Sequence, residues 1–213
     1  MKRICLTICF FTLLFSCNSD EDIQDHQQEE ANFYALTVGN SWVYKNYRYN
    51  LNTELYEDTG VIDSINIIGT EQINENTYYK FRRWTTRNET NIAFCNPNGE
   101  HFELLRDSLG YLIRDDGSVK FVNNNFNERQ LASDIWGTIY EKLVEGETNM
   151  SVEAGDFYCI NSERYARDTT NEELPGLDRF YYSDGMGLIL DTSSFVNNPI
   201  HSIERRLDSY FVQ

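Results

Sequence analysis

Basic residues are scarce in this chain. Its 213 residues include 18 lysines and arginines against 34 aspartates and glutamates, which gives a formal net charge of −16. Proteins that bind nucleic acid neutralise phosphates with basic side chains, so this balance argues against a nucleic-acid partner. It also disfavours adhesion to anionic lipid headgroups. A charge of this sign more often indicates solubility than a cationic ligand.

Recognisable catalytic and cofactor motifs are lacking as well. No serine lies in a Gly-x-Ser-x-Gly elbow and no phosphate-binding glycine loop opens a helix, so we predict no catalytic residue and no cofactor. Of the three histidines, only His101 and His201 follow the N-terminal region, and two isolated histidines predict no metal site. The turns 115–117 and 184–185 lack the repeated carboxylates of an EF-hand. An enzyme with an unrecognised pair of facing carboxylates stays an open alternative.

Only one long apolar run is present, from Ile4 to Phe15. It follows a short basic start and is too short to span a bilayer core, which needs about 20 residues. The run ends in Leu14-Phe15-Ser16-Cys17, which resembles the lipobox read by the bacterial lipoprotein signal peptidase. The resemblance implies a signal peptide over residues 1–16 and acylation of Cys17, with chains such as palmitate. The alternative is an ordinary secretory signal with a chance cysteine.

The segment after Cys17 is polar and contains no lysine or arginine through Glu30. Such a segment buries too little apolar surface to offset its ordering entropy, so we predict a flexible tether over residues 17–32. The run Ser19–Asp22 resembles the surface-export signal of Bacteroidetes-type lipoproteins. This implies a lipid-anchored protein on the outer membrane, displayed at the cell surface, with a periplasm-facing position as the alternative. The membrane would then be a partner through the anchor alone.

Few cysteines remain for the folded domain. Of the five in the chain, two lie in the signal peptide and one is Cys17, which leaves Cys95 and Cys159. In an oxidising compartment these two could form a disulfide. The alternative is two separately buried thiols. Neither has the neighbours needed for a cysteine-ligated zinc site.

Helical periodicity is absent and alanine is scarce beyond residue 33, whereas tyrosine, phenylalanine, valine, isoleucine and threonine are abundant. We therefore predict a mainly β fold: a single domain over residues 33–213, built as a strongly curved antiparallel meander sheet, open or partly closed into a barrel. At most one short helix is expected, around 128–134. The expected strands are 42–49, 61–68, 78–86, 92–95, 102–106, 111–114, 119–122, 139–144, 151–154, 157–165, 179–182, 188–191 and 202–212.

Four short blocks, residues 34–44, 154–159, 181–189 and 204–210, resemble a set of bacterial lipoproteins of unknown function. The resemblance implies a curved antiparallel sheet similar to LolA/LolB-like lipoprotein carriers. It implies no activity.

Alternation along the expected strands separates their two faces. In the third strand Tyr79 and Phe81 share one face, and Lys80 and Arg82 share the other. In the last strand, Arg205 lies on the same face as the apolar residues.

Aromatic residues cluster early in the chain. They could form the core of a leucine-poor sheet, or some of them, with Trp42, Tyr44 and Trp84 as candidates, could face a ligand groove. Three functions follow. The first is a surface-displayed, non-enzymatic module that contacts a protein or a glycan. The second is a carrier or sensor of an apolar, lipid-like ligand inside the curved sheet. The third is an enzyme with an unrecognised site.

Overall fold

The structure is a computed structural model that describes residues 32–213, and this part of the chain is all β. Residues 32–213 contain no helix with the length and apolarity needed to cross a membrane. The predicted lipobox and most of the predicted tether lie outside the described residues. The strands are β1 (Ser41–Asn50), β2 (Leu55–Ile73), β3 (Asn76–Thr86), β4 (Gly99–Ser108), β5 (Tyr111–Arg114), β6 (Val119–Val122), β7 (Arg129–Asp134), β8 (Gly137–Val152), β9 (Gly155–Asp168), β10 (Glu173–Ser183), β11 (Gly187–Ser193) and β12 (Ile203–Phe211).

All twelve strands belong to one antiparallel sheet in the order β6-β5-β4-β3-β2-β1-β12-β11-β10-β9-β8-β7. Every neighbour is the next strand along the chain, except that β1 pairs with β12. The sheet therefore consists of two meanders, β1–β6 and β7–β12, joined at its centre by the first and last strands. Its two edges, β6 and β7, are consecutive in the chain.

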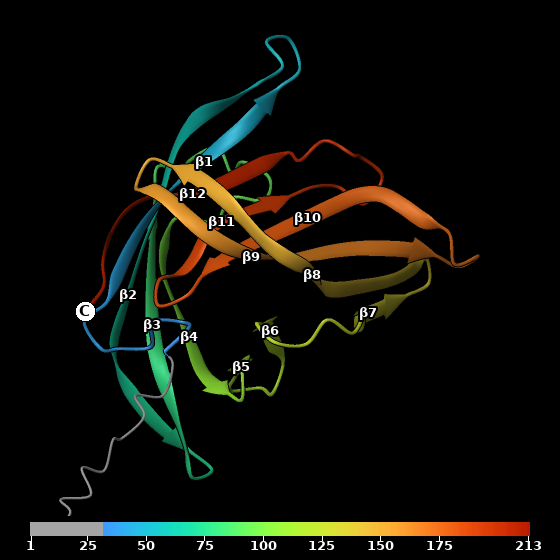
Figure 1. The fold of residues 1–213 in the computed structure, drawn as a ribbon. Helices are drawn as coiled ribbons and strands as arrows, with labels where there is room; N and C mark the ends of the chain where they lie inside the picture. The colour runs from blue at the N-terminus through green and yellow to red at the C-terminus, as the bar shows by residue number, and fades with distance from the viewer. Residues whose placement is uncertain (1–31) are drawn as a thin grey trace, which may run out of the picture. The chain divides into compact units, whose positions relative to one another are not determined.

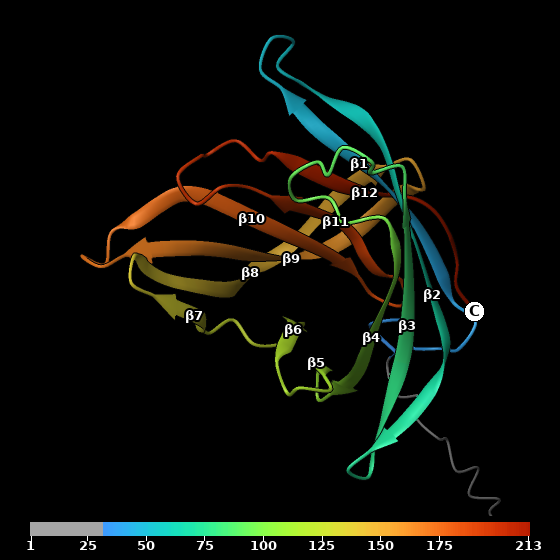
Figure 2. The same cartoon turned by 180° about the vertical axis from the view of Figure 1, so that it is seen from behind.

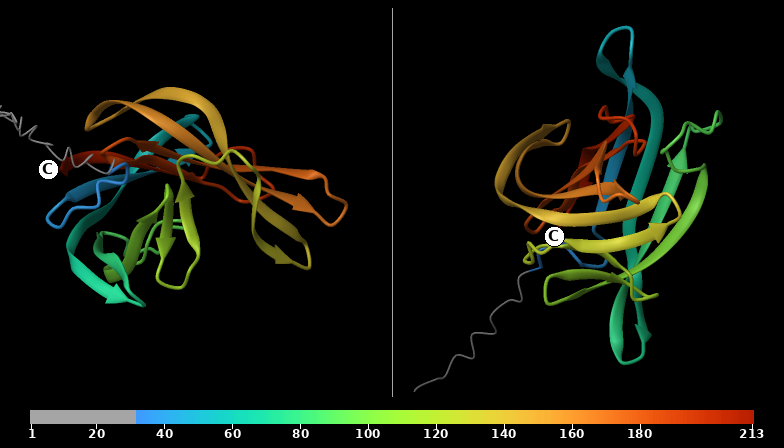
Figure 3. Two further views of the ribbon diagram at one scale, coloured as in Figure 1. Left: turned by 60° about the horizontal axis from the view of Figure 1, so that its bottom comes forward. Right: turned by 90° about the vertical axis from the view of Figure 1, so that its right-hand side faces the viewer.

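The sheet is strongly curved and does not close into a barrel. Figures 1 and 2 show the two meanders diverging from the β1–β12 pair, with β6 and β7 returning toward each other, and Figure 3 shows the curl from two further sides. The curvature coincides with β-bulges, which bend a strand and increase its twist. The register shifts lie between Val43 and Tyr44 and between Lys45 and Tyr47 in β1, between Ile67 and Gly69 in β2, and between Val144 and Glu147 in β8.

The segment before β1 lies across the concave face and connects the two meanders. The hydroxyl of Tyr34 donates to the carbonyl of Gly110 in the β4–β5 turn at 2.6 Å. The carbonyl of Phe33 accepts from the backbone N–H of Gly185 in the β10–β11 turn at 3.1 Å. Tyr34 and Leu36 are buried. A short segment without regular structure is thus held by both halves of the sheet.

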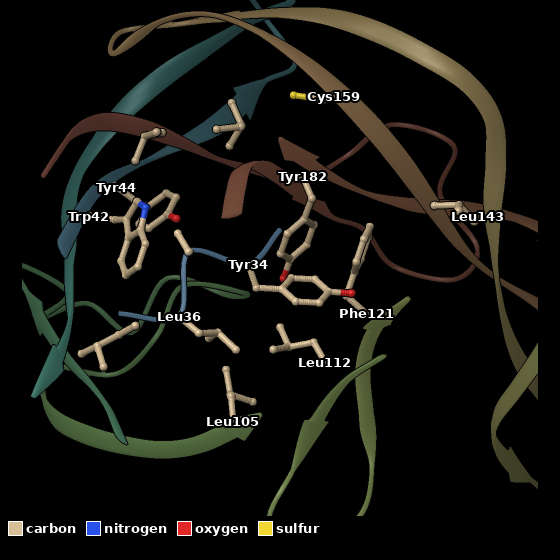
Figure 4. Close-up of a cluster of buried hydrophobic side chains, with 14 residues drawn as sticks. Tyr34, Leu36, Trp42, Tyr44, Leu105, Leu112, Phe121, Leu143, Cys159 and Tyr182 are labelled. Atoms are coloured by element: carbon tan, nitrogen blue, oxygen red, sulfur yellow. The ribbon is translucent and has the colours of Figure 1, made fainter. Parts of the chain in front are cut away.

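The hydrophobic core occupies the concave face. The ring of Phe121 from β6 stacks on Tyr182 from β10, with centroids 3.9 Å apart, and the Tyr34 ring meets both edge-on. Figure 4 shows Tyr34 between this pair and the side chains of Trp42 and Tyr44. Residues from both meanders therefore share one core.

The predicted fold class is confirmed, since the described chain is one curved antiparallel sheet in a single domain. The short helix around 128–134 was wrong. Residues 129–134 form β7, which pairs with β8 from Arg129 opposite Glu141 to Asp134 opposite Gly137. Pairing with a long neighbour that already belongs to the sheet decides the structure here, because the local pattern carries no strong preference.

The predicted strand at 92–95 is also wrong. The side chain of Asn88 accepts from the backbone N–H of Ile92 at 2.8 Å and donates to the carbonyl of Asn96 at 2.8 Å. This side chain satisfies backbone groups that a strand partner would otherwise satisfy, so the segment remains a loop. Conversely, the segments predicted separately at 139–144 and 151–154 belong largely to one long strand, β8.

Candidate functional site

A cavity of about 630 Å³ lies on the concave face. The N-terminal segment, β1 to β6 and β10 to β12 contribute to its wall, so residues far apart in the sequence meet there. Its apolar wall combines aromatic and aliphatic side chains in equal number and includes Tyr34, Leu36, Trp42, Tyr44, Phe81 and Tyr182.

Trp42 and Tyr44, two of the three aromatic residues predicted to face a ligand, belong to the buried core and also contribute to the cavity lining. The Trp42 indole N–H donates to the carbonyl of Met186 at 2.9 Å, and the Tyr44 hydroxyl donates to the carbonyl of Leu188 at 2.8 Å. Because their polar atoms are bonded to the β10–β11 region, both rings are held in place. Trp84 is half exposed and does not line the cavity, since it alternates away from Phe81 and onto the outer face.

Charged side chains form the rest of the wall, and cations exceed anions. Five basic residues line the cavity against three acidic ones, the reverse of the balance in the whole chain. The basic residues are Lys80, Arg83, Arg114, Lys120 and Arg205, and the acidic ones are Glu71, Glu103 and Asp115.

Glu103 on β4 neutralises two of these cations. Its carboxylate accepts from Arg114 Nε at 2.6 Å and pairs with the Lys120 ammonium. Burial alone would raise the pKa of Glu103, but Lys120 and Arg114 outweigh that effect and lower it. Burial lowers the pKa of Lys120, an effect that its pairing with Glu103 opposes. A carboxylate with both oxygens paired to cations is poorly suited to act as a general acid.

Arg205 on β12 is also neutralised. Its Nε and Nη2 donate to the two carboxylate oxygens of Asp191, each at 2.8 Å, and its Nη1 lies 3.9 Å from Asp63. The guanidinium lies over the ring of Tyr44 at 5.2 Å. These contacts compensate the cost of burying the charge of an arginine in the centre of the sheet. Lys80, in turn, pairs with Glu71 at 2.6 Å.

Arg83 on β3 differs from the other four cations of the wall. Within the described residues it forms no salt bridge and no side-chain hydrogen bond, and its Nε is buried without a partner. Burial lowers the pKa of Arg83, and the charge of Arg205 acts in the same direction. The guanidinium keeps its proton nonetheless, because its ordinary pKa is far above neutrality.

The two cysteines of the domain are free thiols, so the structure contains no Cys95–Cys159 disulfide. The two thiols have different surroundings. Cys159 lies on β9 in the hydrophobic core, whereas Cys95 lies where the charges of Asp63, Arg205 and Arg48 act on it. Figure 4 shows Cys159 apart from the aromatic groups. Burial raises the pKa of Cys95 to about 11 and that of Cys159 to about 12, so both thiols are protonated at neutral pH.

The two histidines have different neighbours: His101 belongs to β4, and His201 lies in the loop before β12. His101 lines the cavity with its Nε2 3.2 Å from the carbonyl of Pro97, and His201 Nε2 lies 3.4 Å from Arg179 Nη1. Across residues 32–213, no group of three or more histidine, cysteine or acidic side chains could hold a metal ion.

Sequence reasoning did not identify the charged half of this site. Strict alternation from Phe81 places Arg83 on the cavity face. Arg205 follows the same alternation as the apolar residues of its own strand, so the sequence pattern could have placed both arginines on the concave face. Lys120 had none, because the short strand β6 does not reveal which face is buried. The pairing of Lys120 with Glu103 depends on strands that meet only in the folded sheet.

No family model and no curated relative match the chain. Two solved structures are similar to it. One is a protein from Bacteroides fragilis, described as exported and as having a YmcC-like fold, with 12% identity, a TM-score of 0.52, and coverage of 85% of this chain and 99% of that one. The other, described as a lipoprotein from Parabacteroides distasonis, has 15% identity, a TM-score of 0.45 and the same coverage. At this identity, the likeness to the first structure shows the fold alone, which is YmcC-like.

Proposed function

We propose that this protein is an exported, lipid-anchored lipoprotein that binds a ligand with an apolar body in its concave cavity and catalyses no reaction on it. The single observation that carries the binding function is the cavity. Its volume falls within the range of about 300–1,000 Å³ that is typical of small-molecule sites, and its walls combine apolar side chains with charged groups.

The anchor rests on the N-terminal sequence. The lipobox-like residues 14–17 and the acidic run after them support attachment through Cys17 at the outer membrane, and surface display is the preferred orientation. The similar structure from Bacteroides fragilis is described as an exported protein, which agrees with export. Expression in a bacterial host with radiolabelled palmitate tests the anchor. Label should enter the wild-type chain and be absent from Cys17→Ser, whereas equal labelling would refute lipidation at this residue.

The cavity changes the order of the functional hypotheses. A module that contacts a protein can do so through its outer surface and needs no cavity. A carrier or sensor of an apolar ligand needs a lined cavity, and Trp42 and Tyr44 line one. We therefore place the carrier function first, and the contact function remains the alternative.

The test uses the mature chain from Asn18 to Gln213, secreted behind a signal without a lipobox. N-phenyl-1-naphthylamine, an uncharged apolar probe, should bind with enhanced fluorescence, and native mass spectrometry should show lipid-sized adducts that disappear on denaturation. Ile65→Trp places a larger side chain on the cavity wall and should weaken probe binding at least about fivefold. A cavity that neither binds the probe nor carries an adduct would refute the carrier function and favour the contact function.

Trp84→Ala is the matched control. Trp84 is opposite Ser64 in the register, one position from the Ile65–Arg83 pair, but its side chain faces outward. This variant should bind the probe as the wild type does. Equal loss of binding in both variants would indicate general disruption of the sheet.

A further inference from the structure

We infer that the cavity binds amphiphiles with an anionic head and that Arg83 is the residue that binds this head. The inference rests on the proposed function and deepens it, because it names the charge of the ligand and the group that recognises it. The observation behind it is the unpaired guanidinium on a wall where every other cation has a partner.

Asp63 and Glu103 are the carboxylates whose charges act on Arg83. Both are already hydrogen-bonded to other side chains. Asp63 is fully buried and accepts from Thr85 Oγ1, from Asn46 Nδ2 at 3.3 Å and from Asn96 Nδ2 at 3.1 Å. It also lies near Arg205. The hydrogen bonds of Asp63 therefore go to other side chains, and it forms no ion pair with Arg83, although its charge acts on Arg83.

Glu103 is occupied in the same way, by Arg114 and Lys120. The direct neighbours of Arg83 in the sheet are Ile65 on β2 and His101 on β4, and neither supplies a negative charge. Arg83 is partly buried, and its Nε is buried without a partner. Burying part of a cation without a counter-charge is costly, so an anion that enters the cavity would supply the missing partner.

Guanidinium geometry sets the class of head group. Its planar fork of N–H donors matches the two oxygens of a carboxylate or a phosphate. The apolar wall adjoins it directly, since Phe81 lies two residues away on the same face of β3 and stacks on Trp42 at 6.1 Å. An alkyl chain against these rings, with its oxyanion on Arg83, satisfies both parts of the wall.

The experiment compares decanoate, decyl phosphate and decan-1-ol, which share one chain and differ in the head. Binding to the mature chain is measured by isothermal titration calorimetry below the micelle concentration. In the wild type we expect both anions to bind about tenfold or more tightly than the alcohol. Arg83→Gln should remove that preference and leave the affinity for decan-1-ol unchanged. Arg83→Lys should retain part of it, because the charge remains and the fork is lost. A preference for only one anion would identify the head as carboxylate or phosphate.

Arg82→Gln is the control for charge. Arg82 is the adjacent residue of β3, lies outside the cavity wall and contacts Asn66 and Glu100 instead. This variant should keep the wild-type preference. The thermal midpoint supplies a second check, since a purely structural arginine would lower it when replaced, whereas loss of an unpaired cation should leave it unchanged or raise it.

Two outcomes would overturn the inference while the carrier function stands. In one, the wild type binds the anions no more tightly than decan-1-ol; in the other, Arg83→Gln keeps the preference. If none of the three amphiphiles binds, the proposed function and the inference fail together. If the anions bind through Arg83 but decan-1-ol and N-phenyl-1-naphthylamine do not bind at all, the anion site stands and the apolar carrier function fails.

Discussion

At the scale of single residues, Glu103 shows how charge and folding are linked in the cavity wall. Burial opposes its ionisation, but the nearby Lys120 and Arg114 lower its pKa below the ordinary value. The folded state therefore binds the proton of Glu103 less tightly than the unfolded state does. The resulting stabilisation is present above the ordinary glutamate pKa and is lost as the pH falls through the lowered value.

We predict that Glu103→Gln lowers the free energy of unfolding by about 1–2 kcal/mol at pH 7, because two charge-assisted hydrogen bonds are lost. The difference between wild type and variant should shrink as the pH falls from about 5 to about 3. Urea unfolding followed by tryptophan fluorescence at each pH measures it.

Glu100→Gln is the control on the same strand. Glu100 is exposed on the outer face and has one long contact, 3.8 Å to Arg82. This substitution removes the same charge and should change stability less. A Glu103→Gln difference that stays constant down to pH 3 would contradict the assigned role of the carboxylate.

At the scale of strands, a buried ion pair fastens the edge strand β7 to the sheet. The Glu141 side chain on β8 is 4% exposed and bonds to Arg129 on β7 and to Arg164 on β9 at 2.9 Å. Arg129 also reaches the carbonyl of Val119 on β6, the opposite edge, at 3.3 Å. One carboxylate thus links three consecutive strands and holds Arg129, whose side chain reaches the opposite edge.

We predict that Glu141→Ala costs about 2–3 kcal/mol, because it leaves two arginines without their common partner while both keep some access to water. Amide hydrogen exchange should accelerate most in β7, and chemical denaturation measures the loss. Glu145→Ala on the exposed part of the same strand is the control and should have little effect. Unchanged exchange in β7 would show that its backbone pairing suffices.

The strands themselves were largely predictable from alternating patterns and turn residues. The turn at 115–118 is an example: Gly117 has φ +83° and its N–H donates to Arg114 at 3.0 Å, which matches the Asp-Gly signal in the sequence. The predictions for segments 92–95 and 128–134 were wrong for opposite reasons. A side-chain amide replaced strand partners in the first, and a long neighbouring strand imposed pairing on the second.

At the scale of the whole domain, Tyr34 connects the two meanders. Its ring contacts Phe121 from the first meander and Tyr182 from the second, and its hydroxyl bonds to Gly110. Because the backbones of the two edge strands, β6 and β7, do not pair with each other, packing across the concave face must help to maintain the curvature.

We predict that Tyr34→Ala destabilises the domain by about 3–5 kcal/mol, the range for truncating a core aromatic. Tyr34→Phe should cost about 1 kcal/mol, because only the hydrogen bond is lost. Val38→Ala, at an exposed position of the same segment, is the control. Chemical denaturation distinguishes the three variants, and equal losses in all of them would contradict a specific role for Tyr34.

Local sequence determined the features that depend on near neighbours. The β class, most of the hairpins, the acidic charge and the lipobox-like start follow from composition, two-residue alternation and short motifs. Tertiary structure alone decided which charges meet. Arg83, Glu103 and Lys120 come from β3, β4 and β6, and Arg205 from β12. Alternation gives the face of a strand but not the identity of its neighbours, so only the strand order and curvature of the sheet could show that four of the five cavity cations are paired and one is not.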